Sequence, residues 1–254
     1  MYIETKALSK QFGGLSAVNN VDFSIDKGKI NAIIGPNGAG KTTFFNLISG
    51  VHKPTSGQVM FKGKDISTLP ANKIAELGVA RTFQTTNLFE KSTVFENVVV
   101  GHSLRTQSNL WDAIFRTKRL KQEQDQSNQK ALEVISFVGL SNIADVPVAN
   151  LSQEEKKRVA FALALATDPE IIFLDEPTAG VNPDETEELS ALIKKMAQQG
   201  ITICLIEHKM KMIMELAHKI MVLNYGEKIA EGTPKQINQN EEVIRAYLGG
   251  SASA

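Results

Sequence analysis

The sequence has very little cysteine, and that scarcity excludes several classes of protein. Cys204 is the single cysteine among 254 residues, so neither a disulfide framework nor a cysteine-based zinc site can form within the chain. It lies in the apolar stretch 201–206, where we expect it to be a small core residue. Such a chain suits a reducing compartment, and the cytosol is the expected location.

Long apolar runs are also missing. No window approaches the roughly 18 to 20 apolar residues that a membrane-spanning helix needs, and residues 1–6 contain no apolar segment of the secretion-signal type. Hydrophobic residues still make up 42% of the sequence, which is typical of a folded globular protein. Any role at a membrane is therefore expected to depend on a partner protein.

An excess of charge of either sign is absent as well. The 28 lysine and arginine residues balance the 28 aspartate and glutamate residues, and both kinds are scattered along the chain. Non-specific nucleic-acid binding requires a broad basic surface, so the sequence argues against it. No internal repeat is visible, and the function must be sought in local motifs.

Short apolar runs alternate with helical patterns along the chain. The strand-like runs cover residues 21–25, 30–34, 59–62, 171–174, 201–206 and 219–223, and the helical patterns cover 42–49, 156–167, 184–198 and 210–217. Several of the strand-like runs are continuously apolar, as in a sheet buried on both faces. Alternation of strands and helices predicts a parallel α/β core. The closely spaced early strands, separated by glycine turns, predict an antiparallel sheet beside that core.

The strand signal disappears in the middle of the chain, where helical patterns replace it. We expect a helical subdomain at 89–165, inserted into an α/β core with its β-subdomain at 1–88 and 166–248. The last residues, 249–254, are small and polar and predict a flexible tail. The chain is therefore predicted to form a single domain with these parts.

A glycine-rich segment follows the predicted strand 30–34 and opens the next helix. Its spacing G-x-x-x-x-G-K-T is that of a phosphate-binding loop, in which glycines let backbone N–H groups turn onto phosphate oxygens. Lys41 would reach the outer phosphates and Thr42 would hold Mg²⁺. A plain glycine turn is the alternative, but the lysine, the hydroxyl, the strand and the helix together favour a nucleoside triphosphate site. The predicted nucleotide ligands are Gly35, Pro36, Asn37, Gly38, Ala39, Gly40, Lys41, Thr42 and Thr43.

Two carboxylates follow the apolar run 171–174. In this arrangement Asp175 would support Mg²⁺ and Glu176 would polarise an attacking water. Neighbours on a strand point to opposite faces, so only one of the two is expected to approach the metal directly. The alternative is that two acids simply begin a loop, and the phosphate loop upstream favours the catalytic interpretation.

Two further side chains fall near the same edge of the sheet. His208 follows the apolar run 203–206, so it is expected at the carboxyl edge of the sheet, within reach of a γ-phosphate. A histidine at a strand end is more often structural, and the other motifs decide for a role at the nucleotide. Gln84 follows 79–83 at the start of the helical segment, where its amide would touch Mg²⁺ or water and report the nucleotide state.

Together these motifs resemble those of the ATP-binding subunits of ATP-binding cassette (ABC) transporters, and the resemblance covers nearly the whole chain. It implies an ABC-type P-loop ATPase fold that binds ATP and Mg²⁺. Phe12 matches the aromatic residue that stacks on adenine, with a packing role as the alternative. The other matches are Gln84 with the coupling glutamine, 171–175 with the Walker B strand, Glu176 with the general base, 179–184 with a loop that crosses a dimer interface, and His208 with the switch histidine.

The resemblance also implies partners and a reaction. One phosphate loop per chain implies pairing with a second ATP-binding subunit, as a homodimer or a heterodimer. Separate permease subunits would hold the chain at the inner face of the membrane, and a solute-binding protein would act indirectly. Water would attack the γ-phosphate in line, with Lys41 and Mg²⁺ stabilising charge, Glu176 acting as base and His208 holding the transferred phosphoryl group.

Within the family, the segments 78–84, 88–101 and 110–115 look most like those of branched-chain amino acid importer ATPases. The loop 179–183 agrees with this assignment. Importers of urea or other amides, and ATPases of lipopolysaccharide export, share much of the pattern. The sequence therefore leaves the solute open, because specificity would lie in the permeases and the binding protein.

The chain departs from the family at the signature loop, which usually reads Leu-Ser-Gly-Gly-Gln. Ser152, expected to contact nucleotide on the opposite subunit, is retained, but Glu154 stands at the glycine position and Glu155 at the glutamine position. Two unit charges about 5 Å apart at an effective dielectric constant near 20 repel by about 3 kcal/mol, so Glu154 predicts a slow or degenerate site. Alternatively, Ser152 and Glu155 form a capping box that starts a helix, and the basic residues 156–158 offset part of the repulsion. A partner with an intact signature would restore one competent site.

Two functions of other kinds remain open at this stage. One is an ATPase of the same fold that clamps ribosomes or DNA. Such proteins usually carry two cassettes, a long coiled coil or a zinc insertion, and none of these is visible in this sequence. The other is a nucleotide-binding regulator with little turnover, which the altered signature keeps open.

Overall fold

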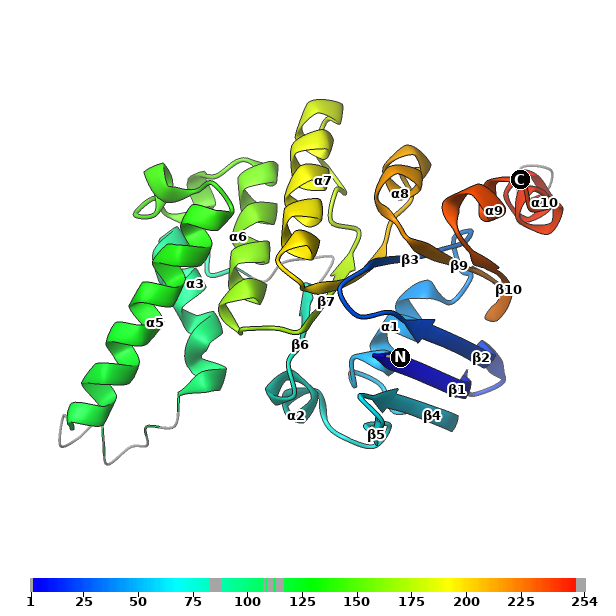
Figure 1. Cartoon of the computed structure of the whole chain (residues 1–254), viewed down its shortest axis with the longest axis horizontal. Helices are drawn as coiled ribbons and strands as arrows, with labels where there is room; N and C mark the ends of the chain where they lie inside the picture. The colour runs from blue at the N-terminus through cyan, green and yellow to red at the C-terminus, as the bar shows by residue number, and fades with distance from the viewer. Residues whose placement is uncertain (1, 83–87, 107, 109–111, 113–116, 250–254) are drawn as a thin grey trace.

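Six strands form the central sheet, in the order β10-β9-β3-β8-β7-β6. The computed structural model describes residues 2–82, 88–106, 108, 112 and 117–249 (Figure 1). The strand pairs are parallel except that β10 runs antiparallel to β9. Every residue of β3, β7 and β8 is buried, which explains their continuous apolar runs. The strands are β3 (Ile30–Ile34), β6 (Val79–Thr82), β7 (Ile171–Asp175), β8 (Thr202–Ile206), β9 (Lys219–Asn224) and β10 (Glu227–Gly232).

The predicted antiparallel sheet is present beside this core, in the order β2-β1-β4-β5. Helix α1 (Lys41–Ile48) fills the space between the two sheets (Figure 1). The ring of Phe44 lies 6.2 Å from that of Phe23 on β2, and the ring of Phe45 lies 5.3 Å from that of Phe173 on β7. The helix that opens at the phosphate loop is thereby fixed on two sides. The strands are β1 (Ile3–Phe12), β2 (Leu15–Ile25), β4 (Ser56–Phe61) and β5 (Lys64–Asp65).

Three helices cover the opposite face of the central sheet. Phe161, Leu189 and Ile213 come from these helices and join a single buried cluster with Ile172 and Ile203 of the sheet. The N-termini of two of them are closed by side chains, since Ser152 and Asn182 form capping boxes. The helices are α6 (Gln153–Ala166), α7 (Pro183–Gln198) and α8 (Met210–Leu216).

The inserted helices lie at the end of the molecule away from the antiparallel sheet (Figure 1). They are α3 (Val94–Gly101) and α5 (Lys118–Phe137), which pack against each other and against α6. The polar, glutamine-rich residues 120–129 lie within one continuous helix, α5. Among the described residues, no helix combines the length and the apolar composition that a membrane span requires. The remaining short helices are α2 (Ala71–Glu76), α9 (Pro234–Asn238), α10 (Glu241–Gly249) and the 3₁₀ turns η1 (His102–Arg105), η2 (Ser141–Ile143) and η3 (Val148–Asn150).

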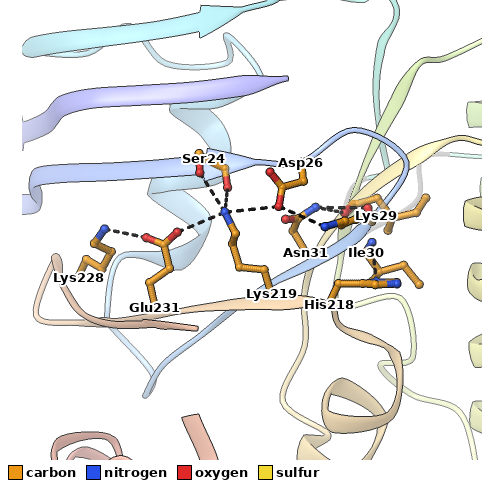
Figure 2. A network of polar contacts seen from close by, with 10 residues as sticks. Ser24, Asp26, Lys29, Ile30, Asn31, His218, Lys219, Lys228 and Glu231 are labelled. Atoms are coloured by element: carbon orange, nitrogen blue, oxygen red, sulfur yellow. Dashed lines mark hydrogen bonds and ion pairs between the residues drawn. The ribbon is translucent and has the colours of Figure 1, made fainter. Parts of the chain in front are cut away.

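A lysine of the central sheet joins the two sheets where the antiparallel sheet passes over β9 (Figure 2). The ammonium group of Lys219 donates hydrogen bonds to the carbonyl oxygen of Ser24 at 3.0 Å and to its hydroxyl at 2.9 Å. It also lies 3.7 Å from a carboxylate oxygen of Asp26 and 3.4 Å from one of Glu231. Strands β2, β9 and β10 are therefore held together by one cation.

Candidate functional site

The phosphate loop leaves β3 and enters α1 through backbone conformations that require glycine. Gly35 and Gly40 have φ values of 154° and 96°. A Cβ atom on Gly35 would lie 2.1 Å from the carbonyl oxygen of Leu223, and one on Gly40 would lie 2.3 Å from that of Ala17. No side chain caps the first turn of α1 and no acidic residue lies in it. Its backbone N–H groups are therefore suited to a phosphate anion.

Lys41 begins α1 and connects the loop to the acids at the end of β7. Its ammonium group donates to the carbonyl oxygens of Gly35 at 2.8 Å and Pro36 at 2.9 Å. Burial lowers the pKa of Lys41, and the negative charges of Glu176 and Asp175 act in the opposite direction. The lysine thus lies between the loop that would cradle phosphates and the two carboxylates, as the sequence predicts.

Asp175 ends β7 and is held by an arginine that the sequence analysis did not single out. One carboxylate oxygen, Oδ2, accepts a hydrogen bond from Arg81 of β6 at 2.9 Å. Arg81 also donates to Asn46 of α1 at 2.7 Å and to Ser49, the residue directly after α1, at 2.9 Å, and its burial lowers its pKa. The other oxygen, Oδ1, is buried without a hydrogen-bond partner among the described residues. The sequence did carry one signal, because Arg81 lies in a short, mostly apolar strand. An arginine buried there needs a partner of opposite charge.

Glu176 lies beyond the strand, in the left-handed region of the backbone. Its φ is 48°, a conformation that costs a non-glycine residue about 1–3 kcal/mol and is found mainly at functional sites. The different directions of Asp175 and Glu176 therefore come from this turn, and the expected alternation along a strand is wrong. The carboxylate Oε1 of Glu176 lies 3.0 Å from Nε2 of His208, and its backbone N–H donates to the carbonyl oxygen of Ile206.

The signature segment starts α6 as the capping-box alternative predicts. The hydroxyl of Ser152 accepts from the backbone N–H of Glu155 at 3.1 Å, and the Glu155 carboxylate accepts from the N–H of Ser152 at 2.7 Å. Glu154 is 8% exposed and is ion-paired with Arg158 on the next turn. Burial raises the pKa of Glu154, and Arg158 opposes that shift. Arg158, which also pairs with Glu188, therefore offsets part of the Glu154 charge within the same subunit, and the effect of Glu154 on an opposite nucleotide stays a prediction.

The remaining candidates are less closely tied to this centre. Phe12, at the end of β1, is 43% exposed, and its ring meets the ring of His52 edge-on at 5.6 Å. The ammonium group of Lys10 lies over the same ring, 5.1 Å from its centroid, so Phe12 has packing partners on this surface and its stacking on adenine stays a prediction. Gln84 belongs to residues 83–87, which lie outside the described ranges. The structure brings together Lys41, Asp175, Glu176 and His208.

Comparison with known proteins identifies the family of the chain that carries this site. A family model described as "ABC transporter" matches residues 18–179. The chain belongs to the ABC transporter family. It is therefore an ATP-binding cassette, an ATPase with the P-loop α/β fold. A second model, described as "Branched-chain amino acid ATP-binding cassette transporter", matches residues 227–253 of this cassette.

Individual relatives of this ATP-binding cassette extend over nearly its whole length. The high-affinity branched-chain amino acid transport ATP-binding protein BraF of Pseudomonas aeruginosa is 40% identical over 248 residues, covering 97% of both chains. LivG of Escherichia coli K12, with the same description, is 41% identical over 248 residues and covers 97% of both. The relationship therefore includes both the phosphate loop and the C-terminal strands.

Solved structures show the same cassette fold. The crystal structure of a nucleotide-free ATP-binding cassette from an ABC transporter has a TM-score of 0.85 and 31% identity, covering 97% of this chain and 98% of that one. An ATP-binding cassette of an ABC transporter in its ADP conformation also has a TM-score of 0.85, with 32% identity and 98% of both chains covered. The predicted fold class, with its antiparallel sheet and inserted helices, is confirmed.

Proposed function

We propose that this ATPase powers the import of branched-chain amino acids through separate permease subunits. The observation that carries the proposal is the 40% identity to BraF over 97% of both chains. Similarity to the branched-chain amino acid model at residues 227–253 supports the same solute class. Pairing of Glu154 with Arg158 supports an ATPase over a regulator with little turnover, because it offsets part of the charge expected to repel the nucleotide.

We assign the steps of hydrolysis to the four residues that meet at the sheet edge. Lys41 binds the outer phosphates once its ammonium group transfers from the carbonyl oxygens of the loop. Glu176 accepts a proton from the attacking water. His208, which is hydrogen-bonded to Glu176, binds the γ-phosphoryl group and so places it opposite that water.

The residues at the end of β7 fit the Mg²⁺ that the fold family implies. Asp175 offers a buried carboxylate oxygen without a partner among the described residues, and Mg²⁺ prefers one or two carboxylates together with phosphates and water. We propose that Asp175 and Thr42 hold the ion, with Gln84 as a further ligand. When bound, the ion neutralises charge on the phosphates. In the described part of the chain, no three acidic, histidine or cysteine side chains are placed so that they could hold a metal ion by themselves.

A second ATP-binding subunit would complete the nucleotide site. Ser152 starts α6 and would face the nucleotide of the other subunit, and the segment 179–184 would cross between the two. We propose that 89–165 forms the subdomain that contacts the permeases, with the core at 1–88 and 166–248. This would place the ATPase on the cytoplasmic face of the membrane.

A groove lined by residues of α2, β6, η1 and α6 is the proposed permease contact. It has a volume of about 470 Å³ and is lined mostly by apolar side chains, among them Val51, Leu104 and Leu163. Arg81 also lines it, and this arginine holds Asp175. A permease segment in the groove would therefore be separated from the proposed metal ligand Asp175 only by the side chain of Arg81.

The test is ATP-dependent uptake by the complete transporter reconstituted in proteoliposomes with its permeases and binding protein. We expect uptake of labelled leucine, isoleucine and valine in preference to urea, and we expect Glu176→Gln to abolish both uptake and ATP hydrolysis. Hydrolysis without leucine uptake would disprove the solute assignment. Unchanged hydrolysis in Glu176→Gln would disprove the catalytic assignment.

A further inference from the structure

Glu207 is a buried acid to which the sequence analysis assigned no role. It follows β8, directly before His208, and it is 4% exposed. Its Oε1 accepts hydrogen bonds from the backbone N–H of Thr178 at 3.0 Å and from the Thr178 hydroxyl. Its Oε2 accepts from the backbone N–H of His208 at 2.7 Å and from that of Lys209 at 3.3 Å. One carboxylate thus accepts four hydrogen bonds from two different loops.

The first of these loops carries Glu176. The left-handed backbone of Glu176 needs support from its surroundings, because an unsupported non-glycine residue would leave this conformation. On one side its N–H is bonded to the carbonyl oxygen of Ile206 at 2.9 Å. On the other side only Pro177 separates it from Thr178, which Glu207 holds through both backbone and hydroxyl. Residues 206 and 207 therefore fix Glu176 at both ends.

The second loop carries His208. Glu207 binds the N–H of His208, and the ring of that histidine lies 3.0 Å from the Glu176 carboxylate. Lys209 strengthens the same link, since its ammonium group donates to the carbonyl oxygen of Thr178 at 3.1 Å and to the hydroxyl of Thr186 at 2.6 Å. The separation of Glu176 and His208 is thus determined by groups bonded to Glu207.

A lysine of a different element lies near Glu207. Burial lowers the pKa of Lys157 on the signature helix α6, and the negative charges of Glu207, Glu176 and Asp175 act in the opposite direction. Its ammonium group donates to the carbonyl oxygen of Glu176 at 3.3 Å. A buried carboxylate with four donors and a nearby cation is a satisfied group in a fixed position. The Glu207 carboxylate can therefore hold the loop that carries Glu176 and the loop that carries His208 in fixed positions.

We propose that Glu207 is a positioning residue for ATP hydrolysis, holding Glu176 and His208 at their working separation through Thr178 and the His208 backbone. The inference rests on the roles proposed above for Glu176 and His208. None of the four hydrogen bonds of Glu207 described above goes to the phosphate loop 35–43. Its loss should therefore lower the rate of hydrolysis and leave nucleotide affinity intact.

The test compares Glu207→Gln, Thr178→Val and Thr178→Ser in the full chain. Glutamine offers one acceptor oxygen where two are needed, and valine removes the hydroxyl at constant shape. We expect both to lower kcat by about 10- to 100-fold, the range for residues that orient a catalytic group. The Kd of a fluorescent ATP analogue should change by no more than about twofold, since the phosphate loop is untouched. Thr178→Ser keeps the hydroxyl and should retain the rate.

Glu187→Gln is the matched control, because Glu187 is an exposed acid on the neighbouring helix α7. A wild-type kcat in Glu207→Gln would overturn the proposal. So would a parallel loss of nucleotide affinity in Thr178→Val, since that result indicates general damage to the fold. Glu176→Gln distinguishes failure of the base assignment from failure of the positioning role. If Glu176→Gln hydrolyses ATP at the wild-type rate, the assignment of Glu176 as base fails. If Glu176→Gln loses activity and Glu207→Gln keeps it, only the positioning role of Glu207 is contradicted.

Discussion

At the scale of single residues, the site depends on buried charges whose partners come from distant parts of the chain. Asp175 and Arg81 are 94 positions apart and pair with side chains only 3% and 7% exposed. Motif spacing predicts Asp175 because a carboxylate after an apolar strand suits a phosphate site. Arg81 could not be assigned from spacing, because its partner is set by the pairing of β6 with β7.

Replacing Arg81 by methionine should destabilise the fold by leaving Asp175 buried and unpaired. Breaking a buried ion pair from one side costs about 3–5 kcal/mol, so we expect a decrease of that size in the free energy of unfolding. Urea denaturation measures this decrease in the free energy of unfolding. The double variant Arg81→Met with Asp175→Asn should recover part of the loss, and a single variant as stable as wild type would show that the pair contributes nothing.

Glu154 is the residue at which the structure changes the expectation from sequence. If the Glu154 carboxylate were unpaired and faced phosphate, Glu154→Gln would remove a repulsion of about 3 kcal/mol. ATP turnover would then rise by up to about 100-fold. Because Glu154 is paired with Arg158, we expect turnover to change by no more than about twofold. The free energy of unfolding should fall by about 1 kcal/mol, since a charged hydrogen bond is weakened. Steady-state ATPase assays distinguish the two cases, and a large increase in rate would restore the repulsion hypothesis.

At the scale of helices and strands, prediction found the uniformly buried strands and the runs that lie in β2 and β4, and it missed the more exposed strands β1 and β10. Strands β3, β7 and β8 are buried throughout and were visible as apolar runs. β1 has exposed polar residues on one face, and β10 has no buried residue, so neither was predicted as an individual strand. Their positions depend on pairing with neighbours and on side-chain links such as Lys219, which local patterns do not show.

Replacing Lys219 by methionine should weaken the attachment of β9 and β10 to the antiparallel sheet. Methionine keeps the apolar stem but loses two hydrogen bonds to Ser24 and two ion pairs. We expect the free energy of unfolding to fall by about 1–2 kcal/mol. Lys228→Met is the matched control, because Lys228 also pairs with Glu231 but makes a local contact, and it should cost less than about 0.5 kcal/mol. Equal losses in the two variants would contradict a special role for Lys219.

At the scale of the whole molecule, segments far apart in the chain meet at the groove that Arg81 lines. Leu104 of η1, Leu163 of α6, and Val79 and Thr82 of β6 are among its lining residues. Residues of β6 therefore face both a partner-accessible surface and, through Arg81, the acid that ends β7. A permease seated in the groove would be coupled to the nucleotide site over a single buried ion pair.

Introducing a charge into this groove should uncouple the ATPase from its permeases. Leu104 is 40% exposed, so Leu104→Asp should change the free energy of unfolding by less than about 0.5 kcal/mol. Burying that carboxylate against an apolar permease segment would cost several kcal/mol. We therefore expect the ratio of ATPase rates with and without permease to fall toward one. Leu132→Asp provides the comparison, because Leu132 is 55% exposed on α5 and does not line the groove, and it should keep the stimulated rate. If Leu104→Asp is stimulated as strongly as wild type, the permeases dock elsewhere, and Arg81 does not couple them to Asp175.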